Sequence, residues 1–202
     1  MKRNLGLASL LLAGSLYGAS EDAGKWYVGV GTFNGSGTQT NTYSGNINTE
    51  LTYGYDVSGM PITIGYVTAT NNRAAFSIVS IDATADADGA KSTISGSEFN
   101  YNFTLESIGT EKLLPYIGFG LGIYTYENSG VRYGIVGNED LNGVAFNVNL
   151  GVLYSITNNL EFEASYINKS IAWQEVQYLN ANTNLSVTED ISGVYLGLNL
   201  KF

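Results

Sequence analysis

The last ten residues of the chain, GVYLGLNLKF, alternate between two kinds of side chain. One row is wholly apolar and consists of Val194, Leu196, Leu198, Leu200 and Phe202. The other row consists of Gly193, Tyr195, Gly197, Asn199 and Lys201. Successive side chains of a β-strand point to opposite faces, so this pattern predicts a terminal strand with one apolar face. The ends of most chains are polar and frayed. An apolar terminal strand therefore has to contact an apolar surface, and the nature of that surface is the main constraint on the fold.

Seven earlier segments alternate in a similar way, which brings the number of predicted strands to eight. They are KWYVGVGTF (25–33), MPITIGYVT (60–68), AAFSIVSID (74–82, the least regular), SEFNYNFTLE (97–106), LPYIGFGLGIYTY (114–126), VAFNVNLGVLYS (144–155) and LEFEASYIN (160–168). Short turns are expected at 70–72, 109–112 and 157–159, and long polar loops at 34–58, 84–95, 127–142 and 173–190. An even number of strands of about ten residues, joined alternately by short turns and long loops, is typical of membrane barrels. The sequence therefore predicts an all-β fold, an eight-stranded antiparallel up-and-down transmembrane β-barrel.

The N-terminal segment, MKRNLGLASLLLAGSLYGAS, has a different character. Lys2 and Arg3 precede an apolar run that is too short to span a bilayer as a helix, and small residues follow near Ala19 and Ser20. This pattern is typical of a secretory signal peptide, so we expect residues 1–20 to be removed and residues 21–202 to form the barrel domain. The chain has no cysteine, which excludes disulfides and lipoprotein acylation.

The direction of the polar rows separates two kinds of barrel. A secreted lipocalin-like barrel would place its apolar rows inside, whereas a membrane barrel places them in lipid. The apolar rows of this chain are bulky and uncharged, and they would overfill the narrow interior of eight strands. We therefore expect the polar rows to form a network in the lumen, in which Lys201 pairs with Glu161 or Glu163. The predicted lumen residues are Glu98, Asn100, Asn102, Glu106, Asn147, Asn149, Glu161, Glu163 and Lys201.

The signal peptide also predicts the orientation of the barrel. An exported chain starts on the periplasmic side, so the short turns are expected there and the long loops outside the cell. Aromatic side chains favour the interface between membrane and water, and several are expected near the periplasmic strand ends. This predicted aromatic girdle consists of Trp26, Tyr66, Phe76, Tyr154, Phe162 and Phe202.

Four stretches of the chain, GKWYVGVG, LPYIGFGLG, NLEFEASY and YLGLNLKF, resemble strands of a known family. It is the family of small eight-stranded outer-membrane barrels of Gram-negative bacteria, of the OmpA, OmpX and opacity-protein type. The resemblance covers essentially all of the chain after the signal peptide. It implies a place in the bacterial outer membrane, contact with lipid and lipopolysaccharide, and a terminal strand that the outer-membrane assembly machinery recognises. Carried onto this chain, the assembly signal consists of Leu198, Leu200 and Phe202.

Several kinds of chemistry are excluded by the residues that the chain lacks or spaces differently. It has no histidine, which rules out a serine or cysteine nucleophile with a histidine base. Glu161 and Glu163 are better interpreted as inward salt-bridge partners than as an acid–base pair. Asp82, Asp86 and Asp88 lack the spacing and the closing glutamate of a calcium loop. We expect no enzyme activity, no catalytic residue, no metal and no cofactor, and a lipid-modifying enzyme remains only a remote alternative.

The charge of the chain excludes another class of partner. Removal of Lys2 and Arg3 from 9 basic residues leaves 7 against 18 acidic ones, a net charge of 7 − 18 = −11. Nucleic-acid binding needs clustered lysine and arginine, so we expect no nucleic acid as a partner.

The predicted loops are the part of the chain suited to recognition. They combine small polar residues with aromatic ones, namely Tyr43, Tyr53, Tyr55, Tyr133, Trp173 and Tyr178. We therefore expect a non-enzymatic outer-membrane barrel that serves envelope integrity or binds an extracellular ligand through its loops, as in adhesion. The alternative is a narrow, cation-preferring channel for ions or small solutes, because Glu98, Glu106, Glu161 and Glu163 would make the lumen acidic.

Overall fold

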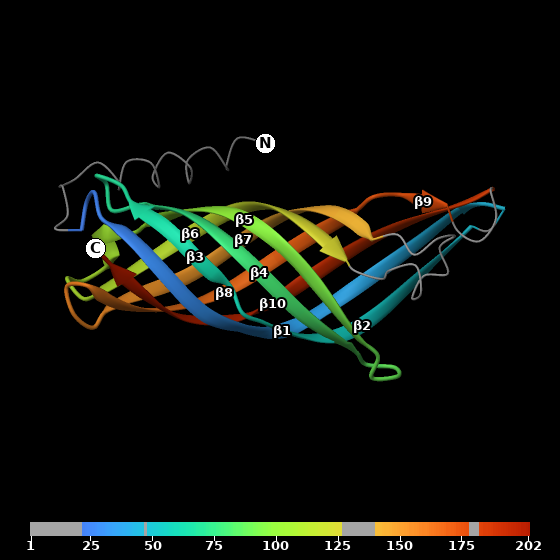
Figure 1. Cartoon of the computed structure of the whole chain (residues 1–202), viewed down its shortest axis with the longest axis horizontal. Coiled ribbons are helices and arrows are strands. Elements are labelled where there is room, and N and C mark those ends of the chain that lie inside the picture. The colour runs from blue at the N-terminus through green and yellow to red at the C-terminus, as the bar shows by residue number, and fades with distance from the viewer. Residues whose placement is uncertain (1–21, 47, 127–139, 178–181) are drawn as a thin grey trace.

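A computed structural model of the chain describes residues 22–46, 48–126, 140–177 and 182–202 (Figure 1). The predicted signal peptide, residues 1–20, lies outside the described residues. The strands are β1 (Trp26–Gly45), β2 (Thr49–Gly59), β3 (Ile62–Val67), β4 (Arg73–Ala85), β5 (Lys91–Thr104), β6 (Leu113–Tyr126), β7 (Leu141–Ser155), β8 (Leu160–Trp173), β9 (Val176–Gln177) and β10 (Thr183–Lys201). A short 3-10 helix, η2 (Glu106–Ile108), lies between β5 and β6.

The strands form one sheet that closes on itself. β1 pairs with β10 over the whole length of both strands, from Tyr27 against Lys201 to Gly45 against Thr183. Each other strand of the ring pairs with its neighbour in an antiparallel manner. β2 and β3 share one position, because both pair with β1 on one side and with β4 on the other. The predicted eight-stranded antiparallel up-and-down barrel is therefore confirmed.

The break between β2 and β3 falls at Met60 and Pro61. Proline has no backbone N–H, so it removes one ladder hydrogen bond at this point. The register is nevertheless kept, since Gly59 faces Phe33 and Ile62 faces Val30 on β1. The break therefore interrupts the hydrogen-bond ladder without moving side chains from one face to the other.

The stagger of the strands sets their tilt and the width of the interior. Partners followed once around the ring from Tyr27 return to β1 at Gly37, a stagger of 37 − 27 = 10 residues. The path runs through Gly65, Ala75, Asn100, Gly120, Asn147, Lys169 and Ile191. With ordinary spacings along and between strands, this stagger corresponds to a tilt of about 40°. An interior of this size is filled by side chains.

The apolar rows face outward and form a belt around the barrel. In the terminal row, the exposed fraction runs from 43% at Leu196 to 66% at Phe202. The alternate side chains of β10, such as Asn199 and Lys201, are buried. Other exposed members of the belt include Ile78, Phe99, Leu121 and Phe146. These faces are those of a barrel in lipid and not those of a soluble lipocalin-like barrel.

The strands are longer than the sequence pattern predicted. Within the predicted loop 34–58, residues 34–45 form the upper half of β1 and residues 49–58 form all but the last residue of β2. The predicted loop 84–95 shrinks to a turn between β4 and β5. β10 begins at Thr183, inside the segment 173–190 predicted as a loop. The predicted strands stop near the end of their apolar rows, but the hydrogen bonds of a ladder join backbone groups and therefore continue through polar residues beyond the belt. The predicted short turns at 70–72, 109–112 and 157–159 do fall between strands.

The extra strand length gathers at one end of the barrel. Figure 1 shows β1, β2 and β10 extending far at the end of the barrel that lies opposite to the C-terminus. We call the sheet formed there by residues 36–45, 49–56 and 183–192 the ribbon. The short turns lie at the other end, which is the periplasmic end in the predicted orientation.

The outward row of β10 allows a matched test of the lipid-facing belt. We expect Leu198→Arg to lower the free energy of unfolding by about 2 to 4 kcal/mol, because a cation near the middle of the belt faces lipid. Thr188→Arg lies on the same face of β10 but beyond the apolar row, so it should change stability by less than about 1 kcal/mol. Urea unfolding in lipid vesicles measures both variants, and equal losses would contradict the assignment.

Candidate functional site

Three buried charges meet in the lumen at the periplasmic end. Arg73 begins β4, Glu161 is the second residue of β8, and Lys201 ends β10. The Arg73 guanidinium donates two hydrogen bonds to the Glu161 carboxylate, at 2.6 and 2.9 Å. Lys201 Nζ donates to Glu161 Oε1 at 3.0 Å, and all three side chains are at most 1% exposed. A carboxylate bound by two cations in this way connects three strands that are distant in the sequence.

The N-terminal turn joins the same group. Asp22 precedes β1 and accepts hydrogen bonds from Lys201 and from Lys25, the latter at 2.8 Å. We call Asp22, Arg73, Glu161 and Lys201 the periplasmic network. Burial raises the pKa of Asp22, but the hydrogen bonds from Lys201 and Lys25 outweigh this effect and leave the pKa below its ordinary value. The network therefore joins the beginning of β1 to the end of β10, at the seam that closes the ring.

The sequence pattern indicated one half of this network. Of the two predicted partners of Lys201, Glu161 and Glu163, it is Glu161 that forms the pair, whereas Arg73 was not predicted to take part. Arg73 lies one residue before the third predicted strand, 74–82, so the alternation did not assign its side chain to either face. Its place in the period-two row of Ala75 and Ser77, which point inward, is the signal that would have found it.

Glu163 lies one inward position above the network. Its carboxylate accepts hydrogen bonds from the Tyr116 hydroxyl at 2.5 Å and from the Asn199 side-chain amide at 2.8 Å. These donors come from β6 and β10, which lie on opposite sides of β8 in the strand order. Glu163 is therefore bound by neutral donors, whereas Glu161 is bound by the cations of Arg73 and Lys201.

Asparagines from two strands meet over glycines of the strand between them. Asn102 of β5 and Asn149 of β7 flank Gly118 of β6 in the hydrogen-bonded register. A Cβ atom on Gly118 would lie 1.8 Å from Asn149 Oδ1 and 2.1 Å from Asn102 Oδ1, so only glycine fits. Gly120 separates Asn100 from Asn147 in the same manner. The predicted polar side chains of β5 and β7 thus pack over Gly118 and Gly120 of β6, where no side chain stands in their way.

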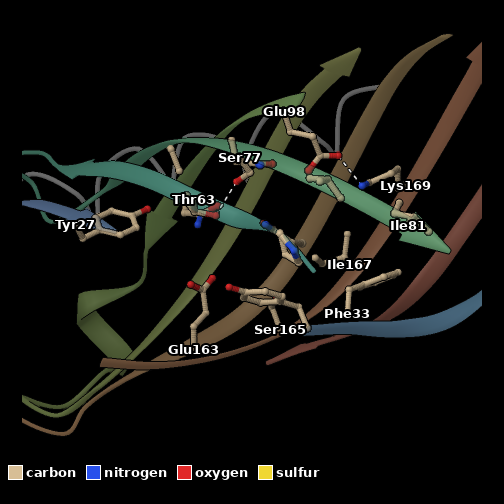
Figure 2. A pocket seen from close by; sticks show the side chains of 17 residues that line it. Tyr27, Phe33, Thr63, Ser77, Ile81, Glu98, Glu163, Ser165, Ile167 and Lys169 are labelled. Atoms are coloured by element: carbon tan, nitrogen blue, oxygen red, sulfur yellow. Dashed lines mark hydrogen bonds and ion pairs between the residues drawn. The ribbon is translucent and has the colours of Figure 1, made fainter. Parts of the chain in front are cut away.

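A cavity of about 80 Å³ lies next to this layer, in the middle of the barrel (Figure 2). Its lining combines apolar side chains with Glu98, Glu163 and Lys169, and Thr63 and Ser77 share a 2.8 Å hydrogen bond across its wall. Buried oxygen atoms of Asn100, Asn102 and Asn149 have no protein partner among the described residues. A polar space of this volume holds a few water molecules and not a larger solute.

A second ion pair lies above the cavity. Lys169 Nζ of β8 is 2.6 Å from Glu98 Oε1 of β5 and 2.6 Å from the Tyr124 hydroxyl of β6. The Tyr124 hydroxyl in turn donates to Glu98. All three side chains are buried. Glu98 was predicted to lie in the lumen, but Lys169 lies just past the strand assigned to 160–168 and was missed.

The upper lumen is apolar and aromatic. Ile94, Ile171, Leu185 and Val187 are completely buried there. Rings of Tyr126 and Trp173 meet edge to face with centroids 5.8 Å apart. Side chains therefore fill the lumen at two levels, with charges at the periplasmic end and with apolar groups toward the ribbon.

Several aromatic residues predicted to lie in recognition loops are part of this apolar core. Tyr55 and Trp173 are buried inside the barrel, and Tyr43 packs against the same cluster. The correction follows from the longer strands, because residues on an inward row cannot present their rings to a ligand outside. Tyr53 stays 41% exposed at the rim. Tyr133 and Tyr178 lie outside the described residues.

The remaining predicted residues occupy different places. Glu106 lies in η2, in a periplasmic turn, and so is not part of the strand row to which the pattern assigned it. Asn147 points into the lumen beside Gly120. Leu198, Leu200 and Phe202 are exposed on the outward row of β10.

Most residues of the predicted aromatic girdle gather near the periplasmic strand ends. Trp26 packs edge to face on Tyr66, with ring centroids 5.3 Å apart. Phe202 and Trp26 exchange two backbone hydrogen bonds. Tyr154 and Phe162 are paired across β7 and β8. Phe76 pairs with Ile64, one outward position further up the barrel than Tyr66.

Two further features bear on chemistry. Within the described residues, no group of three histidine, cysteine, aspartate or glutamate side chains is placed to hold a metal ion. No helix in the described part of the chain is long and apolar enough to cross a membrane.

Comparison with known proteins identifies the architecture. No protein-family model matches the chain, and no curated protein sequence does. The outer membrane protein OprG from Pseudomonas aeruginosa superposes with a TM-score of 0.56 at 14% identity, over 92% of this chain and 99% of that chain. The chain has the fold of a small bacterial outer-membrane β-barrel. Together with the apolar belt, this fold places the barrel in a bacterial outer membrane.

Two other outer-membrane barrels are similar at lower scores. Neisserial surface protein A has a TM-score of 0.43 at 16% identity, over 89% of this chain and 99% of that chain. The outer membrane protease OmpT from Escherichia coli has a TM-score of 0.36 at 8% identity, over 93% of this chain and 100% of that chain. At these identities the likeness concerns the fold, so the function has to be argued from the residues of this barrel.

The periplasmic network predicts a large difference between the two adjacent glutamates. We expect Glu161→Gln to lower the free energy of unfolding by about 3 to 5 kcal/mol, because it leaves Arg73 and Lys201 buried without their shared carboxylate. Glu163→Gln is the matched control, since the amide oxygen still accepts a hydrogen bond from Tyr116 or Asn199 and the loss should be smaller. Urea unfolding in lipid vesicles compares the two, and similar losses would contradict the network.

The lowered pKa of Asp22 predicts a pH dependence of stability. A carboxylate whose folded pKa lies below its unfolded value stabilises the fold at pH values above the unfolded pKa, and this contribution is lost as the pH falls through the folded pKa. We therefore expect Asp22→Asn to destabilise the barrel at neutral pH, and the difference from wild type to shrink once the pH falls below 3.8, the ordinary pKa of an aspartate. Asp88→Asn, in the exposed turn after β4, serves as the control. A difference that is constant with pH would contradict this account.

Proposed function

We propose that this chain is a non-enzymatic outer-membrane barrel that presents its ribbon for recognition at the cell surface. One observation carries the proposal. Side chains fill the lumen at two levels, while β1, β2 and β10 continue as a paired sheet beyond the apolar belt. A closed lumen with an extended outer sheet is suited to holding a binding surface away from the membrane.

The lumen does not favour the alternative of a cation-preferring channel. Three of the four acidic residues that suggested it are engaged, Glu98 with Lys169, Glu161 with Arg73 and Lys201, and Glu163 with hydrogen-bond donors. A conducting pathway would also need to pass the apolar layer around Ile171 and Leu185. Moving these buried charges and apolar groups aside would cost more than the binding of a small ion returns.

The residues likewise support a protein without catalytic activity. One neighbour in fold is a protease, so the fold by itself does not decide the matter. This chain has no histidine, and Glu98, Glu161 and Glu163 in its lumen are held by lysine, arginine, tyrosine and asparagine side chains. A base that is already paired inside a packed lumen has no route to a substrate.

The proposed partners follow from the two surfaces of the barrel. The apolar belt contacts outer-membrane lipid and, on the outer side, lipopolysaccharide. The terminal row, with Phe202 exposed at its end, would be read by the outer-membrane assembly machinery. The ribbon would contact an extracellular partner, and its rigid pairing with the barrel favours binding that contributes to adhesion.

A shortened ribbon tests this function. Residues 40–52 are replaced by an Asn-Gly turn that joins Gln39 to Tyr53, which face each other across β1 and β2. Both proteins are displayed on bacteria, and retention on protein-coated surfaces is measured alongside conductance in planar bilayers. We expect neither protein to conduct and only the full-length ribbon to support retention, because the barrel below Gln39 is unchanged.

Two results would contradict the proposal in different ways. Steady single-channel currents from the wild-type protein would support the channel alternative. Equal retention of cells that display the full and the shortened ribbon would show that recognition does not depend on it. Heat-modifiable migration on gels is the control for a folded barrel in both proteins.

A further inference from the structure

The cavity in the middle of the barrel is bordered by a carboxylate that no cation of the described residues neutralises. The charged side chains that line this cavity are Glu98, Glu163 and Lys169. Lys169 and Glu98 form an ion pair at 2.6 Å, so their charges cancel. No salt bridge among the described residues includes Glu163, whose carboxylate accepts hydrogen bonds from the neutral side chains of Tyr116 and Asn199. The lining therefore carries a net charge of 1 − 2 = −1.

Amide oxygens without hydrogen-bond donors lie beside the same cavity. Asn102 of β5 and Asn149 of β7 line it and are only 6% and 7% exposed. Their Oδ1 atoms have no hydrogen-bond partner among the described residues. Both oxygens lie close to one point, the position of a Cβ atom on Gly118, at 2.1 and 1.8 Å, so they are at most 3.9 Å apart. Two buried acceptors at this spacing repel each other unless a donor or a cation satisfies them.

Hydroxyl groups complete the polar part of the lining. Thr63 of β3 and Ser77 of β4 share a hydrogen bond of 2.8 Å, and Tyr27 and Ser165 also border the cavity. Figure 2 shows Glu163 and Ser165 on one side of this space and Thr63 and Ser77 on the other. Carboxylate, amide and hydroxyl oxygens are the ligands that hard cations prefer. Such a site differs from those built of histidine, cysteine or clustered carboxylates, because amide oxygens supply much of its ligand set.

The net charge of the lining selects the valence of the cation. An unbalanced charge is costly in a lumen that excludes bulk water. A monovalent cation cancels the charge of Glu163, whereas a divalent cation would leave the site with a net positive charge. The volume of about 80 Å³ accommodates a small ion with a few water molecules, and it excludes a bulky organic cation.

We propose that this cavity binds a monovalent alkali cation, sodium or potassium, between the Glu163 carboxylate and the amide oxygens of Asn102 and Asn149. The site goes beyond the proposed recognition function and does not depend on it. The ion neutralises Glu163 and satisfies the two amide oxygens, so it stabilises the folded barrel. The apolar layer above the cavity and the periplasmic network below it keep the ion in place, so binding does not entail conduction.

Ion-dependent stability is the first test. The protein is unfolded by urea in vesicles of zwitterionic lipid at constant ionic strength, with sodium or potassium chloride exchanged for choline chloride, whose cation is too bulky for the cavity. Above the dissociation constant, each tenfold rise in the bound cation should raise the folding equilibrium constant by about tenfold. The steeper of the two alkali series identifies the preferred ion. Equal stability in alkali and choline salts would show that the cavity holds water alone and would overturn the proposal.

Two variants with the same change in charge assign the effect to the cavity. Glu163→Gln and Asp88→Asn each remove a negative charge, but Asp88 lies in the exposed turn after β4. Screening of surface charge by salt therefore affects both in a similar way. We expect Asp88→Asn to keep the alkali-cation dependence and Glu163→Gln to lose it. The same dependence in both variants would contradict a site at Glu163.

Asn149→Asp tests the selection by charge. It adds a carboxylate to the lining, whose net charge becomes 1 − 3 = −2. A divalent cation neutralises this charge, so we expect calcium to stabilise the variant more than sodium does. The wild-type protein should show the opposite order. If calcium and sodium rank equally in the two proteins, the lining does not select the ion.

A direct measurement of binding decides the matter even where a variant fails to fold. The wild-type protein is refolded in detergent with radioactive sodium, or with radioactive rubidium as a substitute for potassium, and is then equilibrated by dialysis. Protein kept unfolded in urea serves as the control. We expect the folded barrel to retain about one ion per chain. Retention no greater than that of the unfolded chain for either ion would refute the site.

Discussion

The closure of β1 on β10 is the constraint on which the rest of the structure depends. Lipid offers no hydrogen-bond partner, so every backbone group in the membrane has to be paired within the sheet, and an open edge there would be costly. The chain meets this demand along the full length of both strands, from Tyr27 against Lys201 to Gly45 against Thr183. The periplasmic network then holds the seam, because Asp22 precedes β1 and Lys201 ends β10.

Closure with eight strands and a stagger of ten residues leaves a narrow interior, and the side chains divide it into zones. Charges face charges near the periplasm, asparagines lie over Gly118 and Gly120 in the middle, and Ile171 and Leu185 pack with aromatic rings above. The charged zone and the apolar zone pack their own groups, whereas the asparagine layer borders the cavity of about 80 Å³. The same packing that stabilises the barrel also blocks its lumen, so a recognition surface has to lie at the outer end. At that end the strands lie in water, and water can form hydrogen bonds with backbone groups that the sheet does not pair.

The residues that sequence reasoning found and missed differ for a physical reason. Period-two alternation identifies the two faces of a strand wherever one face is apolar, and it therefore predicted the outward row of Leu198 and Phe202 and the inward position of Lys201. It loses the strand where both faces are polar, as in 36–45. Arg73 and Lys169 were missed because each lies one residue beyond the bounds of a predicted strand, 74–82 and 160–168 respectively. Trp173 was assigned to the predicted loop 173–190, but it ends β8.

The sequence by itself determined the all-β class, the number of strands in the ring, the face that contacts lipid and the pairing of Lys201 with one of Glu161 and Glu163. These follow from local alternation and from the order of short and long connections. Only the tertiary structure decided that Glu161 also holds Arg73, that Lys169 reaches Glu98, and that β2 extends beyond its pairing with β4. Such contacts depend on the stagger of the strands and on where each ladder ends, because these set which residues from distant strands share one level of the barrel.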